Sequence, residues 1–220
     1  MDIDIARVLG PMDRSVRRFD KDGKAASAVT LTRLYDTDVE DLWDAVTSPE
    51  RLPRWFLPVE GDLQVGGRYQ LQGNAGGTIT ACAPPQRFEA TWEFGGDVTW
   101  IAVRITREGD QARLTLEHTA LVQDHWTQFG PGAVGIGWDM GLMGLLLHLD
   151  SGAALDQAEV FAWMASDQGK AFVAESGEAW RAADVTGGED PAEAKVRSDR
   201  TIAFFQGEPP PEVAHPGTGS

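Results

Sequence analysis

Hydrophobic and polar residues alternate along the middle of the chain, and this alternation predicts a run of strands. In residues 87–94, RFEATWEF, Phe88, Ala90, Trp92 and Phe94 fall on one face and polar residues fall on the other. This is the pattern of a strand with one buried and one solvent-facing side. Similar segments at 66–72, 76–83, 98–106 and 112–121 are separated by turns rich in glycine, proline and aspartate. Together with a β-branched strand at 25–35, they predict an antiparallel meander.

Two segments follow the helical period instead. In residues 37–56, Thr37 and Glu40 are spaced as a capping box, and Ser48 and Pro49 divide the segment. We therefore expect two short helices arranged in a V, with the apolar stripe of the first facing the core. Residues 135–150, GIGWDMGLMGLLLHLD, predict one long helix of about 16 residues, shorter than the roughly 20 residues that a membrane span needs.

The long helix carries four glycines, although each costs roughly 1 kcal/mol relative to alanine. Along it run two stripes about 100° apart, a ridge of Trp138, Leu142, Leu145 and Leu149 and a nearly bare stripe of Gly137, Gly141, Gly144 and His148. The bare stripe has two interpretations, which the sequence leaves open. It lets another part of the chain approach closely, or it forms one wall of a ligand cavity.

The order of the elements is one strand, two helices, a run of antiparallel strands and one long helix. A curved sheet hides its apolar face when a single helix lies across it, so we predict an α+β fold of the helix-grip type. We expect a flexible N-terminal arm at 1–24, the helix-grip domain at 25–152, a helical C-terminal extension at 153–206 and a disordered tail at 207–220.

Net charge narrows the range of partners. The chain has 34 acidic and 19 basic residues, a net charge of −15. Phosphate backbones and anionic lipid surfaces attract the opposite charge, so we expect neither nucleic acid nor a membrane as a partner. The single cysteine, Cys82, cannot form an intramolecular disulfide, and the first residues lack the apolar run of a signal peptide. Both features favour a soluble, cytoplasmic protein.

Five segments of the sequence together resemble one known family. They are PERLPRWFLP, GDLQVGGRY, GGTITACAPPQRFEATWEF, RLTLEHT and the pattern GW-x-x-x-L-x-x-L that starts at Gly137. In this order they are similar to the bacterial homologues of the activator of heat-shock protein 90 ATPase, which belong to the START-like (SRPBCC) superfamily. The resemblance covers residues 27 to about 152. It implies a sheet wrapped around the long helix, with a deep apolar cavity between the two.

The resemblance also implies which residues line that cavity. Large flat rings form rigid walls and can stack on a ligand. The expected ligand-binding residues are Trp55, Phe56, Tyr69, Phe88, Trp92, Phe94, His118, Trp138, Gly141, Leu142 and Leu145. For each aromatic residue the alternative is ordinary core packing.

Few residues of the chain suggest catalysis. His118 shares a strand face with Leu114 and Leu116 and therefore points inward, where it either serves a ligand or is a hydrogen-bonded core residue. The histidines and the cysteine lack metal-ligand spacing, and the glycine pairs at 66–67 and 76–77 precede strands rather than phosphate-binding helices. We therefore expect no metal and no cofactor, and we name no catalytic residue.

Three functional hypotheses remain. The first is a protein that binds a hydrophobic or aromatic small molecule in the cavity. The second, implied by the resemblance, is a co-chaperone-like module that has a chaperone as its partner. The third is an enzyme of the aromatase/cyclase kind, in which His118 or Tyr69 supplies a proton step. The appended helices could also pair two copies of the chain into a homodimer.

Overall fold

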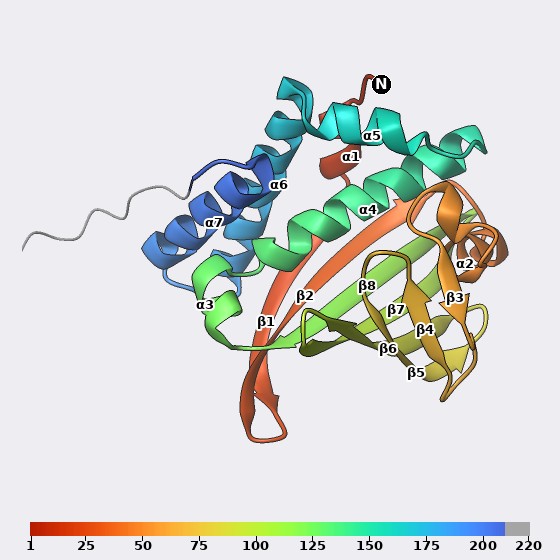
Figure 1. Cartoon of the computed structure of the whole chain (residues 1–220), viewed down its shortest axis with the longest axis horizontal. Helices are drawn as coiled ribbons and strands as arrows, with labels where there is room; N and C mark the ends of the chain where they lie inside the picture. The colour runs from red at the N-terminus through yellow and green to blue at the C-terminus, as the bar shows by residue number, and fades with distance from the viewer. Residues whose placement is uncertain (210–220) are drawn as a thin grey trace, which may run out of the picture.

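The computed structural model describes residues 1–209, and these form an α+β fold around one curved antiparallel sheet (Figure 1). The sheet has eight strands in the order β1-β2-β8-β7-β6-β5-β4-β3. Its strands are β1 (Asp13–Lys21), β2 (Lys24–Tyr35), β3 (Val59–Gly61), β4 (Arg68–Leu71), β5 (Gly76–Ala83), β6 (Arg87–Phe94), β7 (Asp97–Glu108) and β8 (Gln111–Leu121). The disordered tail predicted for 207–220 lies, from residue 210 onward, outside the described residues.

The helices cover the concave side and one end of the sheet (Figure 1). They are α1 (Ile5–Leu9), α2 (Val39–Thr47), the 3-10 turn η1 (Leu52–Arg54), α3 (Asp124–Phe129), α4 (Gly132–Ser151), α5 (Gln157–Met164), α6 (Asp167–Thr186) and α7 (Pro191–Gln206). Helix α4 lies across the concave face, where its buried leucines share one core with apolar residues of β2, β7 and β8. The predicted helix-grip architecture is thereby confirmed.

Helix α4 is longer than the sequence predicts. It has 20 residues rather than about 16, and it is the one helix of the described chain that is long and apolar enough to cross a membrane. In its most apolar window, 56% of the residues are buried inside the protein. More than half of this window is therefore part of the packed core.

The N-terminal residues are part of the sheet, so the prediction of a flexible arm at 1–24 is wrong. Strand β1 pairs with β2 along its whole length, from Asp13 opposite Thr32 to Lys21 opposite Lys24. Two side chains of β1 that face α6 are arginines, Arg14 and Arg18, and both reach carboxylates on helices. An inward arginine breaks the apolar alternation that marks a strand, which is why the sequence pattern hid β1.

The start of α2 also differs from the prediction. Its N-cap is Asp38, whose side chain accepts a hydrogen bond from the backbone N–H of Asp41 at 2.8 Å. Thr37 donates instead to the Asp41 carboxylate at 2.6 Å, so the box predicted from Thr37 and Glu40 does not form. Aspartate and threonine are both good N-caps, and their adjacency made the sequence assignment wrong by one residue.

A buried carboxylate joins three parts of the chain. Asp139, on α4, accepts two hydrogen bonds from Arg14 of β1, at 2.9 and 3.1 Å. From α6, the hydroxyl of Ser176 and the indole N–H of Trp180 donate to the same carboxylate, at 2.6 and 3.0 Å. The Asp139 side chain is 0% exposed and that of Arg14 is 7% exposed. Hydrogen bonds to one carboxylate thus hold both β1 and α6 to α4.

We predict that Asp139→Asn lowers the free energy of unfolding by about 3–5 kcal/mol, because it leaves the Arg14 guanidinium buried without a counter-charge. Urea denaturation followed by circular dichroism measures the loss. The matched control is Asp199→Asn, which removes an exposed pair with Lys195 on α7 and should cost less than about 0.5 kcal/mol. Equal losses in the two variants would contradict a special role for Asp139.

The four glycines that the sequence singled out have different neighbours. A Cβ on Gly144 would lie 2.5 Å from the backbone oxygen of Trp55, and one on Gly135 would enter the indole ring of Trp180. A Cβ on Gly141 would make an ordinary contact with the Phe56 ring at 3.5 Å, and one on Gly137 would meet nothing within 4 Å. Close approach of other parts of the chain therefore explains Gly135 and Gly144, whereas Gly137 faces open space.

This difference predicts opposite effects for two similar substitutions. Gly137→Ala should stabilise the fold by about 0.5–1 kcal/mol, since it gains helix propensity without a clash. Gly144→Ala should destabilise it by about 1–3 kcal/mol, since backbone must move to admit the methyl group. Thermal or urea unfolding of the pair checks both signs, and a shared sign would contradict the packing described.

Candidate functional site

A cavity of about 410 Å³ lies between α4, the segment formed by α2 and η1, and the concave face of the sheet. None of the described residues on its wall has a charged side chain. Seven of the lining residues are aromatic, namely Trp43, Trp55, Phe56, Tyr69, Phe88, Trp92 and Trp138. The remainder are mainly branched aliphatic residues. The site is therefore a large apolar hollow with flat, rigid walls.

The structure brings most of the predicted site residues together. Trp55, Phe56, Tyr69, Phe88, Trp92, Trp138 and Leu142 all line the cavity. The central strands and α4 follow regular periods, so the inward positions along them could be identified from the sequence.

Four predicted residues do not line the cavity. Phe94 is 58% exposed beside the β6–β7 turn, because β6 runs past the edge of the hollow. Leu145 is fully buried in the core beneath α4, and the ring of Phe56 covers Gly141. His118 lies behind the wall, where it contacts Trp138. The first three are corrections to the predicted set; His118 retains a connection to the site.

The sequence did not identify the mouth of the cavity. Exposed lining residues gather there, namely Pro49 after α2, Leu63 in the β3–β4 loop, and Cys82 and Pro84 at the end of β5. Loop residues have no periodicity that would mark them. Strict alternation along β5 would turn Cys82 to the face opposite Ile79. A β-bulge between Ile79 and Ala81 shifts the register and places Cys82 opposite the inward-facing Phe88.

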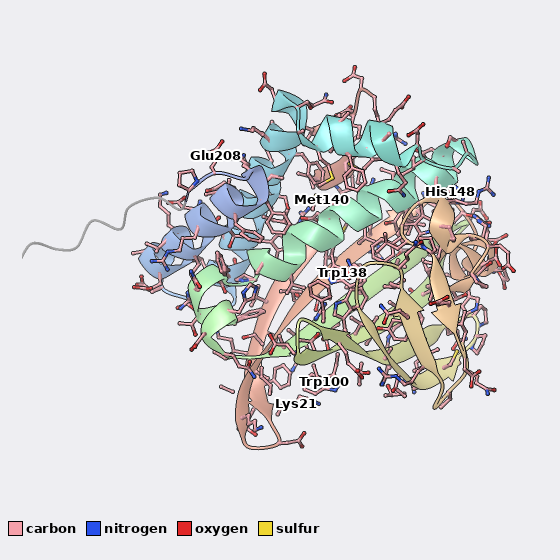
Figure 2. The ribbon with its side chains drawn as sticks, viewed as in Figure 1. Lys21, Trp100, Trp138, Met140, His148 and Glu208 are labelled. Atoms are coloured by element: carbon pink, nitrogen blue, oxygen red, sulfur yellow. The ribbon has the colours of Figure 1, made fainter. Side chains whose placement is uncertain are left out.

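Aromatic rings of the wall form a continuous surface from η1 to the sheet. The ring centroids of Trp55 and Phe56 are 5.4 Å apart, and those of Phe56 and Trp138 are 6.1 Å apart, with interplanar angles of 27° and 23°. Trp138 in turn meets Trp92 at 5.1 Å and 58°. Figure 2 shows Trp138 projecting from α4 towards the sheet. Such an arrangement offers both faces and edges of rings to a flat apolar molecule.

Several polar hydrogens of the wall residues are bound within the protein. The indole N–H of Trp55 donates to the backbone oxygen of Ala45 at 2.8 Å, and the hydroxyl of Tyr69 donates to the backbone oxygen of Thr91 at 2.7 Å. Burial, with a smaller effect of the nearby Glu93 carboxylate, raises the pKa of Tyr69 to about 12. Tyr69 is therefore a neutral phenol committed to the backbone, which does not favour a proton-transfer role near neutral pH.

His118 has partners at both ring nitrogens. Its Nδ1 accepts a hydrogen bond from the indole N–H of Trp138 at 2.9 Å, and its Nε2 lies 2.8 Å from the hydroxyl of Thr99. Burial lowers the pKa of His118 to about 4. The ring is therefore neutral at physiological pH. Of the two interpretations that the sequence left open, the structure supports the hydrogen-bonded core histidine.

Metal binding has no support in the described part of the chain. No group of three or more histidine, cysteine, aspartate or glutamate side chains in residues 1–209 is placed to hold an ion.

The fold and the hollow define a helix-grip protein with an internal apolar site. Comparison with protein families gives the more specific assignment, since the model of the "Activator of Hsp90 ATPase homolog 1-like protein" family matches residues 36–146, half of the chain. The chain belongs to this family.

Solved structures support the same assignment. CalU16 from Micromonospora echinospora is 31% identical to this chain, with a TM-score of 0.63 over 78% of this chain and 97% of CalU16. EF2215 from Enterococcus faecalis, described as a conserved protein of unknown function, is 15% identical, with a TM-score of 0.54 over 71% of this chain and 89% of its own. The latter likeness shows the fold alone. No curated protein matches the sequence.

The pKa of His118 predicts how stability depends on pH. An unfolded histidine takes up a proton near pH 6.5, whereas folded His118 resists protonation until about pH 4. Between these values the unfolded state binds more protons, so stability falls as the pH decreases. We expect a loss of about 2 kcal/mol between pH 7.5 and pH 5 from this residue. Urea unfolding at the two pH values measures it, and His118→Asn should lack this part of the decline. An identical decline in the variant would contradict the assignment.

Proposed function

We propose that this protein binds an uncharged, hydrophobic or aromatic small molecule in the cavity between α4 and the sheet. The observation that carries the proposal is the 410 Å³ apolar hollow with seven aromatic residues on its wall. Its size lies within the range of about 300–1,000 Å³ that is usual for small-molecule sites. Side chains around a hollow lack dispersion contacts on one side, and an apolar ligand supplies them.

The wall also indicates the polarity of the ligand. A charged group placed there would lose its hydration without gaining a partner among the lining residues. The N–H of Trp55, the N–H of Trp138 and the hydroxyl of Tyr69 are already used inside the protein. The proposed site therefore recognises its ligand mainly by shape and ring stacking.

A matched pair of substitutions tests this proposal. Ala90 is buried on the cavity wall, whereas Ala102 lies on the outer face of β7, opposite Glu89. Both can be changed to phenylalanine, which adds the same volume inside and outside the hollow. The neutral probe N-phenyl-1-naphthylamine, which fluoresces in apolar surroundings, reports binding. We expect saturable binding by the wild type and by Ala102→Phe, and binding at least about tenfold weaker in Ala90→Phe.

Cys82 provides an independent measure of ligand binding, because its free thiol lies exposed at the mouth of the cavity. A bound probe should slow alkylation of this thiol by iodoacetamide in the wild type and not in Ala90→Phe. If neither the probe nor a panel of neutral polycyclic aromatics binds the wild type saturably, the proposal fails.

The family description supports a second candidate function, a co-chaperone that acts on heat-shock protein 90. A co-chaperone would act through an outer surface rather than the cavity, so the two functions can be separated. Stimulation of the chaperone's ATPase by both the wild type and Ala90→Phe would indicate an outer docking surface. Absence of any stimulation would leave the cavity as the working site. We also propose a cytoplasmic location, since the one cysteine is a free thiol, as is usual in reducing compartments.

A further inference from the structure

A chain of hydrogen bonds runs behind the aromatic wall of the cavity. The indole N–H of Trp138 donates to His118 Nδ1 at 2.9 Å, His118 Nε2 lies 2.8 Å from the Thr99 hydroxyl, and that hydroxyl donates to the backbone oxygen of Trp92 at 3.0 Å. The four residues come from α4, β8, β7 and β6. The chain therefore connects the two tryptophans of the wall through residues that do not line the cavity.

The chemistry of the partners fixes the direction of every bond. An indole nitrogen can only donate, so His118 Nδ1 must carry a lone pair and the ring proton must lie on Nε2. Nε2 then donates to Thr99, which leaves the threonine proton free to reach the Trp92 carbonyl. Each donor has one acceptor along the chain, and none is left without a partner. A fully satisfied buried network of this kind restricts side chains to one arrangement.

Packing alone leaves Trp138 free on one side. One side of the indole faces the cavity, and Trp138 is only half-buried. The bond to His118 is thus a directional restraint on an indole that is not enclosed on every side. Its orientation matters beyond one residue, because Phe56 stacks on Trp138 and Trp55 stacks on Phe56.

We propose that His118 is a positioning residue of the ligand site, which sets the orientation of Trp138 and through it the shape of the cavity. This inference rests on the proposed function for its effect on affinity. His118 does not touch the ligand. It holds the ring that does, and Thr99 holds His118 in the tautomer that can accept from the indole. His118 thereby has a role in specificity without any role in proton transfer.

The surroundings of His118 favour a neutral ring. Val29 on β2 and Ile101 on β7 lie opposite it in the sheet, and Trp138 covers it from α4. Burial is the one cause of its lowered pKa, with no contribution from a charged group of the described residues. The acceptor at Nδ1 is therefore present across the neutral pH range.

Two substitutions of His118 separate positioning from mere structural support. In His118→Asn the amide oxygen can take the place of Nδ1 and accept from the indole, whereas His118→Leu keeps the bulk and removes the acceptor. His125→Asn, at an exposed site on α3, is the matched control. Two readouts are taken at pH 7. They are the solvent exchange of the Trp138 indole N–H, followed by ¹⁵N NMR and assigned with Trp138→Phe, and the affinity for N-phenyl-1-naphthylamine.

We expect slow exchange of this N–H in the wild type and in His118→Asn, and exchange at least about tenfold faster in His118→Leu. Affinity should follow the same order, with a loss of about tenfold in His118→Leu and recovery to within about threefold in His118→Asn. His125→Asn should match the wild type in both readouts. The proposal would be overturned if the His118→Leu variant folds and binds the probe as tightly as the wild type. It would also be overturned if the His118→Asn variant restores slow exchange of the Trp138 N–H without restoring the affinity for the probe.

If the His118→Leu variant does not fold, the Thr99→Val variant tests the proposal instead. This near-isosteric change removes the partner that fixes the tautomer, and we expect affinity to fall by about threefold. An affinity equal to that of the wild type in Thr99→Val would then overturn the proposal. If the wild type itself does not bind the probe, the proposed function fails. The exchange measurement still decides whether His118 holds Trp138, so the two failures are distinguishable.

Discussion

The ion pair between Asp139 and Arg14 is the interaction on which the arrangement of β1, α4 and α6 depends. A carboxylate in the middle of the most apolar helix loses its hydration, and several donors must replace the lost water. Arg14, Ser176 and Trp180 supply them from positions far apart in the sequence. Meeting this requirement brings the first strand and the C-terminal helices to one side of α4. The need to satisfy one charge thus helps to explain why β1 and α6 pack on the same helix.

A different side of α4 is left for the cavity. Trp138 directly precedes Asp139, and successive residues of a helix point about 100° apart. One residue therefore faces the hollow while the next faces the buried ion pair. Because the helix is clamped by β1 and α6, the aromatic wall has a fixed support. The hydrogen bond from Trp138 to His118 then fixes the orientation of the Trp138 indole ring.

Regular alternation explains which features the sequence could predict. The central strands and the long helix bury one apolar face each, so their positions and most of the inward residues, such as Trp92 and Leu142, follow from spacing. Strand β1 was missed because its inward residues include Arg14 and Arg18, whose partners lie on distant helices. The role of Asp139 could not be predicted for the same reason. In the sequence it is a charged residue within an apolar helix, and its partners lie on distant elements. At the mouth of the cavity, loops and a β-bulge break the period, so Leu63 and Cys82 could not be placed.

The close approach at Gly144 has a consequence for how this site can diversify. The backbone oxygen of Trp55 lies so near the helix there that no side chain fits between them. The spacing between α4 and the segment that carries Trp55 is consequently set by main-chain contact, independently of the residues that line the hollow. Replacement of lining side chains can then alter the outline that a ligand meets while the frame around it keeps its dimensions. A scaffold of this kind permits new binding preferences to arise by a few substitutions, without a compensating change elsewhere in the molecule.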